Sequence, residues 1–102
     1  EGVSSSLNNL KNLNILVVDD NDGAREIFYE MLSNLGAKVS LAASGQEAIE
    51  LLGTTTFDLV LMDWKMPGLD GIETIEKIQQ TPTLQNLPII LVSAYRKERA
   101  MQ

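Results

Sequence analysis

The stretch Asn14-Ile15-Leu16-Val17-Val18-Asp19-Asp20 decides the fold, and Leu59-Val60-Leu61-Met62-Asp63 repeats its pattern. Each stretch holds a short apolar run that ends abruptly in a carboxylate. Short, continuously apolar runs are typical of parallel strands that are buried on both faces of a sheet. Carboxylates avoid a hydrophobic core unless they are paired or bind a metal, so acids at the ends of two buried strands indicate a functional site.

Helical patterns alternate with these strands. Apolar residues at the i, i+3, i+4, i+7 spacing predict a helix from Asp22 to Leu35 that ends at Gly36. Ser44 and Glu47 form a capping box, which predicts a second helix ending near Gly53. The expected buried stripe of the first helix comprises Ala24, Ile27, Phe28, Met31, Leu32 and Leu35.

The first strand is predicted at Asn14–Val18, and three further strands are predicted at Lys38–Ala42, Phe57–Met62 and Pro88–Val92. A third helix begins after an N-cap at Asp70 and is expected to turn three isoleucines inward, and a fourth helix begins at Tyr95 and runs to Gln102. These isoleucines are Ile72, Ile75 and Ile78. Because each of the first three helices connects two strands, the alternation predicts an α/β fold with a doubly wound parallel sheet.

Composition limits the function. The 102 residues suffice for one domain, expected over residues 14–102, with residues 1–13 as a linker or a remnant of a longer chain. Eight basic against fourteen acidic residues give a net charge of −6, which argues against nucleic-acid binding. No apolar run reaches the roughly 20 residues that span a bilayer, so no membrane contact is expected from this domain. The absence of histidine and cysteine excludes thiolate and imidazole chemistry.

The predicted fold places the acids together. In a doubly wound sheet, ligands bind at the carboxyl ends of the strands where the strand order reverses. If the second and third strands flank the first, Asp19, Asp20 and Asp63 converge there, and Ser93 follows one strand further along. Oxygen ligands alone favour a hard ion, for which Mg²⁺ is the best candidate, completed by phosphate oxygens. Asp63 could then be a nucleophile that forms an acyl phosphate.

Each of these residues also has a purely structural interpretation. Asp19 or Asp20 alone could be the N-cap of the first helix, and Asp63 alone could be a turn residue. Ser93 gains weight only from its position at a strand end. The site is therefore predicted from the four positions together.

Four separated motifs carry a family resemblance. Asp19-Asp20, Asp63, Met66-Pro67-Gly68-Leu69-Asp70-Gly71 and Ser93-Ala94 resemble, in order and spacing, the motifs of a response-regulator receiver domain. The resemblance covers roughly residues 14–102 and implies a flavodoxin-like fold with strand order 2-1-3-4. The run Leu61-Met62-Asp63-Trp64-Lys65-Met66-Pro67 most resembles receivers attached to hybrid sensor histidine kinases.

The resemblance implies a function in a two-component phosphorelay. Asp63 would accept a phosphoryl group from a phosphohistidine of a histidine kinase or histidine phosphotransfer domain, so the domain would catalyse its own phosphorylation and dephosphorylation. Mg²⁺ would be held by Asp19, Asp20, Asp63 and the backbone carbonyl of Lys65, and Ser93 would sense the phosphoryl group and switch the surface. The family implies a cytoplasmic location, on its own or as the cytoplasmic part of a membrane-anchored kinase.

The resemblance also leaves alternatives open. A full receiver continues into a fifth strand, which ends in a phosphoryl-binding lysine, and a fifth helix, whereas this sequence stops at Gln102. We therefore expect Pro88–Val92 to form an exposed edge that pairs with a second copy or exchanges elements. A binding-only pseudo-receiver remains the main alternative function. A magnesium-dependent phosphatase is disfavoured, because Lys65 occupies the position where those enzymes place an acid–base aspartate.

Overall fold

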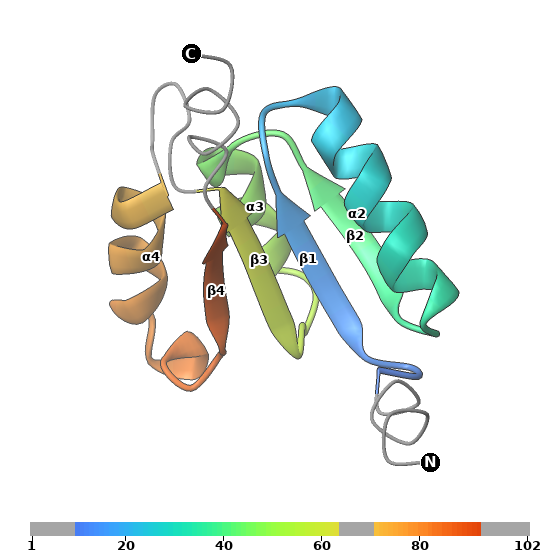
Figure 1. The fold of residues 1–102 in the computed structure, drawn as a ribbon. Coiled ribbons are helices and arrows are strands. Elements are labelled where there is room, and N and C mark those ends of the chain that lie inside the picture. Colours follow the sequence, from blue (N-terminus) through green and yellow to red (C-terminus); the bar gives the residue numbers. More distant parts are fainter. Residues whose placement is uncertain (1–9, 64–70, 93–102) are drawn as a thin grey trace.

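A parallel four-stranded sheet with helices on both faces forms the framework of a computed structural model, which describes residues 10–63 and 71–92 (Figure 1). The strands are β1 (Asn14–Val18), β2 (Lys38–Ala42), β3 (Leu59–Asp63) and β4 (Ile89–Val92), in the order β2-β1-β3-β4. The helices are α2 (Asp22–Asn34), α3 (Gly45–Leu52), α4 (Gly71–Gln79) and the short 3-10 helix η1 (Pro82–Leu84). The predicted α/β fold and its strand order are confirmed.

The register aligns the carboxyl ends of the central strands. Val18 of β1 pairs with Ala42 of β2 on one side and with Met62 of β3 on the other. Asp63, the last residue of β3, pairs with Val92 of β4. Because β2 and β3 flank β1, the strand order reverses at β1, which is the ligand-binding position of doubly wound sheets.

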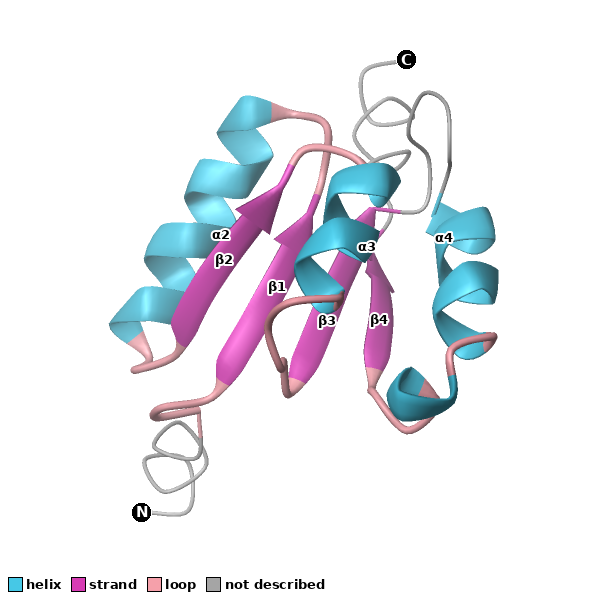
Figure 2. Ribbon diagram, turned by 180° about the vertical axis from the view of Figure 1, so that it is seen from behind, coloured by secondary structure: helices cyan, strands magenta, loops and turns pink. Residues whose placement is uncertain are grey.

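Two hydrophobic clusters fill the space on either side of the sheet. Figure 2 shows α3 and α4 on one face, with α2 on the opposite face. The cluster beneath α3 and α4 consists of Leu16, Val18, Ala42, Ala48, Leu52, Phe57, Val60, Met62 and Ile78. The cluster beneath α2 consists of Ile15, Val17, Leu32 and Ala37, with Leu10 and Leu13 among the half-buried residues packed against it. Consecutive residues of β1 enter opposite clusters because strand side chains alternate between faces.

The helix ends follow the predicted capping signals. Gly36 closes α2 with a φ of +97°, a left-handed conformation that glycine adopts without steric cost. The Ser44 hydroxyl accepts a hydrogen bond from the Glu47 amide at 3.1 Å, which confirms the N-cap of α3. The Glu47 carboxylate accepts from the Ala43 amide at 2.8 Å, one residue before the amide that an ideal capping box would use.

Two strands begin later than the sequence predicted. β3 starts at Leu59 instead of Phe57; Phe57 still packs into the core, and Asp58 binds the first residue of β1 through its side chain. The Asp58 carboxylate accepts from the Asn14 amide at 2.8 Å. β4 starts at Ile89 instead of Pro88, although the carbonyl of Pro88 still accepts from the Val60 amide at 3.0 Å. Proline lacks the amide proton that a ladder needs.

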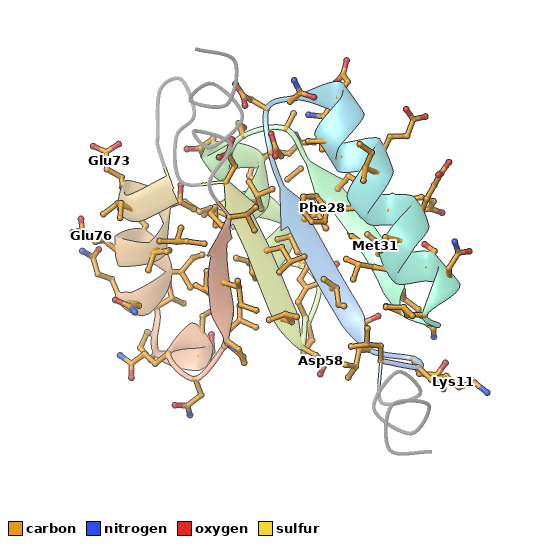
Figure 3. The ribbon with its side chains drawn as sticks, in the orientation of Figure 1. Lys11, Phe28, Met31, Asp58, Glu73 and Glu76 are labelled. Carbon is orange, nitrogen blue, oxygen red and sulfur yellow. The ribbon has the colours of Figure 1, made fainter. Side chains whose placement is uncertain are left out.

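Three apolar residues predicted to face inward are exposed instead. Ile27 and Met31 of α2 are 63% and 47% exposed, and Ile72 of α4 is 45% exposed. Phe28 and Leu32 provide the contacts between α2 and the cluster beneath it, and Figure 3 labels Phe28 and Met31 on the helix. Consecutive helix residues are rotated by about 100° around the helix axis, so the side chain of Ile27 points about 100° away from that of Phe28, which faces the sheet. The spacing of apolar residues in the sequence therefore predicted buried faces on α2 and α4 that are wider than the observed ones.

Some expected features lie outside the described residues: the Asp70 cap and the helix expected at Tyr95–Gln102. Within residues 10–63 and 71–92, no helix has the length and apolar character needed to cross a bilayer.

Candidate functional site

Three carboxylates meet where the strand order reverses. Asp19 directly follows β1, Asp20 comes next, and Asp63 ends β3. One carboxylate oxygen of each residue lies within 4.8 Å of the others. Asp19 and Asp63 are only 4% and 3% exposed, whereas Asp20 is open to solvent. The structure thus brings together the three acids that the sequence predicted to converge, two of them buried and one accessible from outside.

Two local hydrogen bonds fix the backbone and the carboxylate of Asp19. Its amide donates to the Ala42 carbonyl at 3.1 Å, which continues the β1–β2 ladder past the last strand residue. Its carboxylate oxygen Oδ1 accepts from the Asn21 amide at 2.9 Å, a tight local turn. One oxygen of the Asp19 carboxylate is therefore engaged by the backbone, and the second carboxylate oxygen leaves a ligand position for a cation.

The N-cap of α2 is Asn21, so neither Asp19 nor Asp20 caps the helix. The Asn21 side chain accepts from the Ala24 amide at 2.8 Å, and its backbone is extended as an N-cap requires. This arrangement rules out the structural interpretation in which an aspartate of the pair serves only as a cap. It leaves Asp20 exposed beside two buried acids.

The donor set suits a small hard cation. Magnesium takes oxygen ligands at about 2.1 Å in an octahedron, so ligands on opposite sides are roughly 4.2 Å apart. A spread of at most 4.8 Å among three carboxylate oxygens is close to that dimension. Three carboxylates without a cation between them repel one another, whereas a divalent ion offsets their charge. The residues fit a magnesium site that would keep further positions for water or phosphate oxygens.

Two predicted site residues lie outside the described residues. The carbonyl of Lys65 and the side chain of Ser93 are not described. Ser93 directly follows Val92, however, and Val92 is the register partner of Asp63. In the sequence, Ser93 therefore comes directly after the last residue of β4, the strand next to the one that ends in Asp63.

Sequence reasoning missed one residue that contacts this edge. The side chain of Arg25, in the first turn of α2, donates from Nη1 to the backbone carbonyl of Asp19 at 2.6 Å. Arginine at this position carries no motif of its own. The available signal was its spacing of three residues from Asp22, with which it forms an ion pair.

A doubly wound sheet in the order 2-1-3-4, with three acids at its reversal, is the architecture of a receiver domain. The family model of the response regulator receiver domain matches residues 15–102, so the chain belongs to that family. Receiver domains take part in two-component signalling and interact with histidine kinases or phosphotransfer domains.

Individual relatives agree with this assignment. The chain is 36% identical to chemotaxis protein CheY-3 of Vibrio cholerae over 85% of its own length and 68% of the relative's. It is 37% identical to the signal transduction histidine-protein kinase BarA of Escherichia coli, covering 81% of this chain and 9% of BarA. Response regulator protein TrrA of Thermotoga maritima, whose structure was solved in complex with Mg²⁺ and BeF, superposes with a TM-score of 0.76. TrrA is 35% identical, over 86% of this chain and 75% of its own.

Proposed function

We propose that this domain accepts a phosphoryl group on Asp63 from a phosphohistidine of a histidine kinase or histidine phosphotransfer domain. The observation that carries the proposal is the convergence of Asp19, Asp20 and Asp63 within 4.8 Å at the reversal of the strand order. The structure of the relative TrrA in complex with Mg²⁺ and BeF supports a magnesium-dependent reaction in this domain. The proposed phosphorelay unit comprises residues 14–102.

Each acid has a distinct part in the proposed reaction. Asp63 is the acceptor: a carboxylate oxygen donates an electron pair to phosphorus, the P–N bond of the phosphohistidine breaks, and its electron pair returns to the imidazole. Asp19 and Asp20, with Asp63 and the carbonyl of Lys65, would hold Mg²⁺. The ion would supply positive charge that offsets the negative charge of the transferring phosphoryl group. In-line positioning of donor and acceptor accounts for much of the rate.

The fixed position of Asp63 at the end of a central strand explains why it is favoured over Asp20 as the acceptor. Asp63 ends a central strand that is hydrogen-bonded on both sides, so its backbone is fixed, whereas Asp20 stands exposed in the β1–α2 loop. A nucleophile held rigidly at the reacting distance is more effective than a mobile one. We further propose that Ser93, which follows the register partner of Asp63, binds the phosphoryl group and couples phosphorylation to the surface near β4.

Incubation with a phosphorylated histidine phosphotransfer domain and Mg²⁺, followed by intact-mass spectrometry, tests the proposal. We expect one added phosphoryl group that is lost in Asp63→Asn and retained in Asp58→Asn. Asp58 is a suitable control because it is an exposed acid at the opposite end of β3, bound to the Asn14 amide. A folded wild-type protein that takes no label from any donor and shows no Mg²⁺-dependent NMR shift with beryllofluoride would instead identify a binding-only pseudo-receiver.

A further inference from the structure

Arg25 connects the first turn of α2 to the backbone of the acid site. Its Nη1 donates to the Asp19 carbonyl at 2.6 Å, and its Nη2 forms an ion pair with the Asp22 carboxylate. The Arg25 side chain is 17% exposed, while that of Asp22 is 93% exposed. The inner hydrogen bond is therefore the protected one, and the outer ion pair faces solvent, where such pairs contribute little stability.

The carbonyl that Arg25 binds belongs to the peptide group between Asp19 and Asp20. Because a peptide group is planar, holding its oxygen also fixes the plane from which the Asp20 side chain departs. The same turn is held on its other side by the Asn21 amide, which donates to the Asp19 carboxylate. Arg25 and Asn21 thus restrain Asp19 at two points, its backbone carbonyl and its carboxylate.

We propose that Arg25 is a positioning residue that fixes the Asp19–Asp20 peptide for magnesium binding; this inference rests on the proposed function of the acid site. The contacts that define this role are those with the Asp19 carbonyl and the Asp22 carboxylate. The guanidinium suits this role because its planar fork donates to the carbonyl and to Asp22 at the same time. A lysine at position 25 has a single ammonium group and would hold the peptide less firmly.

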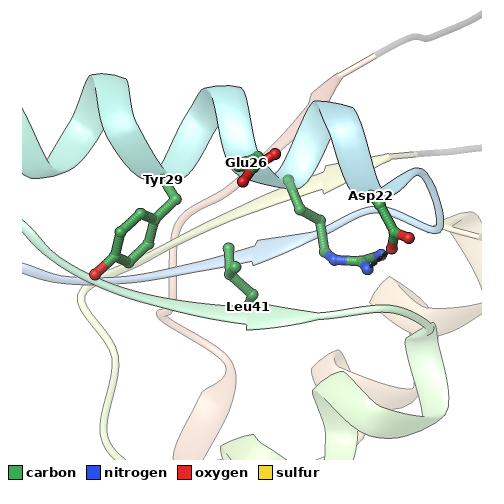
Figure 4. Close-up of a pocket in the computed structure, with 5 residues that line it drawn as sticks. Asp22, Glu26, Tyr29 and Leu41 are labelled. Carbon is green, nitrogen blue, oxygen red and sulfur yellow. Dashed lines mark hydrogen bonds and ion pairs between the residues drawn. The ribbon is translucent and has the colours of Figure 1, made fainter.

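The surroundings of Arg25 allow the substitution to be made. Arg25 borders an open pocket of about 380 Å³ between α2 and β2, together with Asp22, Glu26, Tyr29 and Leu41. Figure 4 shows this pocket, with dashed lines marking the interaction at Asp22. Since one side of the Arg25 stem faces this open space, a shorter side chain leaves no sealed cavity in the core. A loss of magnesium affinity would then report on the hydrogen bond and not on collapse of the fold.

Magnesium titration of the folded domain tests the inference. Trp64 is the only tryptophan and directly follows Asp63 in the sequence, so its fluorescence is a suitable probe. We expect Arg25→Ala to raise the magnesium Kd by roughly tenfold or more, the range seen when a residue that orients a metal ligand is removed, and Arg25→Lys to raise it less. Asp22→Asn, which removes only the outer ion pair, should leave the Kd within about twofold of the wild type.

A second measurement needs no metal. In the presence of a chelator, hydrogen exchange at the Asn21 amide should be faster in Arg25→Ala than in the wild type, because the turn loses one of its two restraints. Lys77→Gln removes one positive charge from α4, far from the acids, and separates a general charge effect from loss of the hydrogen bond.

The outcomes separate this inference from the proposed function. If the wild type binds no Mg²⁺ at millimolar concentrations, the proposed function fails. If the wild type binds Mg²⁺ and folded Arg25→Ala binds it equally well, the positioning role is refuted while the proposed function stands. Should Arg25→Ala not fold, Arg25→Lys decides: an unchanged Kd together with unchanged Asn21 exchange would overturn the inference.

Discussion

Removing one charge from the acid site should stabilise the fold as long as no divalent cation is present. Asp19 and Asp63 are both buried, and their nearest oxygens lie within 4.8 Å of each other. At an effective dielectric constant between about 20 and 80, two unit charges at that separation repel by roughly 1 to 3.5 kcal/mol. Asp19→Asn removes this repulsion while keeping the shape of the side chain.

The substitution also weakens one favourable contact. The Asn21 amide donates to the Asp19 carboxylate at 2.9 Å, and replacing a charged acceptor by a neutral one costs about 1 kcal/mol. We therefore expect a net increase in the free energy of unfolding of up to about 2.5 kcal/mol, and each kcal/mol corresponds to about 4–8 °C in Tm for a domain of this size. The pair with Asp20 adds little, because Asp20 is exposed and screened.

Urea unfolding with a chelator present, and again with excess Mg²⁺, measures the effect. The proposed binding of Mg²⁺ to the folded state alone would stabilise the wild type, so the advantage of Asp19→Asn should shrink or reverse when the metal is added. Glu76→Gln is the matched control: it removes the same unit of charge from the exposed surface of α4, where Figure 3 labels Glu76. If Asp19→Asn is no more stable than Glu76→Gln in the chelator, stored repulsion among the acids is not the correct explanation.

Three further predictions concern the framework. Gly36→Ala should lower the free energy of unfolding by about 1–2 kcal/mol or more, measured in urea, because φ is +97° and a Cβ would lie 3.1 Å from Cα of Lys11. Gly53→Ala, with a φ of −77° and its nearest contact at 3.4 Å, should stay within about 0.5 kcal/mol of the wild type, and equal losses at both glycines would contradict this reasoning. Ser44→Ala should cost about 1 kcal/mol by the same measurement and Ser44→Asp much less, since Asp can still cap α3; similar losses in both would argue against the cap. Ile90, 50% exposed on β4, should promote self-association of the 102-residue chain, so sedimentation velocity should find Ile90→Lys less associated; a wild type that is monomeric at every concentration would dispose of this expectation.

The central strands were predictable because the pattern that marks a strand is local in the sequence, and the same pattern occurs twice. Both runs are apolar at every position and end in an acid, so β1 is predicted with its observed bounds and β3 with its observed carboxyl end to within one residue. The meeting of Asp19 and Asp63 follows from topology alone, since parallel neighbouring strands end at the same edge of a sheet. These parts of the fold and site required no knowledge of side-chain conformation.

The missed features depend on neighbours that a sequence pattern does not contain. Spacing marks Ile27 and Ile72 as members of apolar stripes, but exposure depends on which elements pack against each helix. The contact between Arg25 and the Asp19 carbonyl depends on a long side chain folding back across six residues. The choice of Asn21 over the two aspartates as the helix cap depends on the turn that Asp19 makes with the Asn21 amide. Three-dimensional geometry decides all of these.

The direction of β1 has a practical consequence for handling this domain. The chain enters the sheet at Asn14, at the edge opposite to the one where Asp19 lies (Figure 1). Five extended residues span roughly 17 Å, so about that distance separates Asn14 from the end of β1 that carries the carboxylates. Immobilising the protein through its amino end on a sensor surface would therefore leave the acidic edge facing the solution. A partner protein could then bind at the acidic end of the sheet without steric hindrance from the attachment.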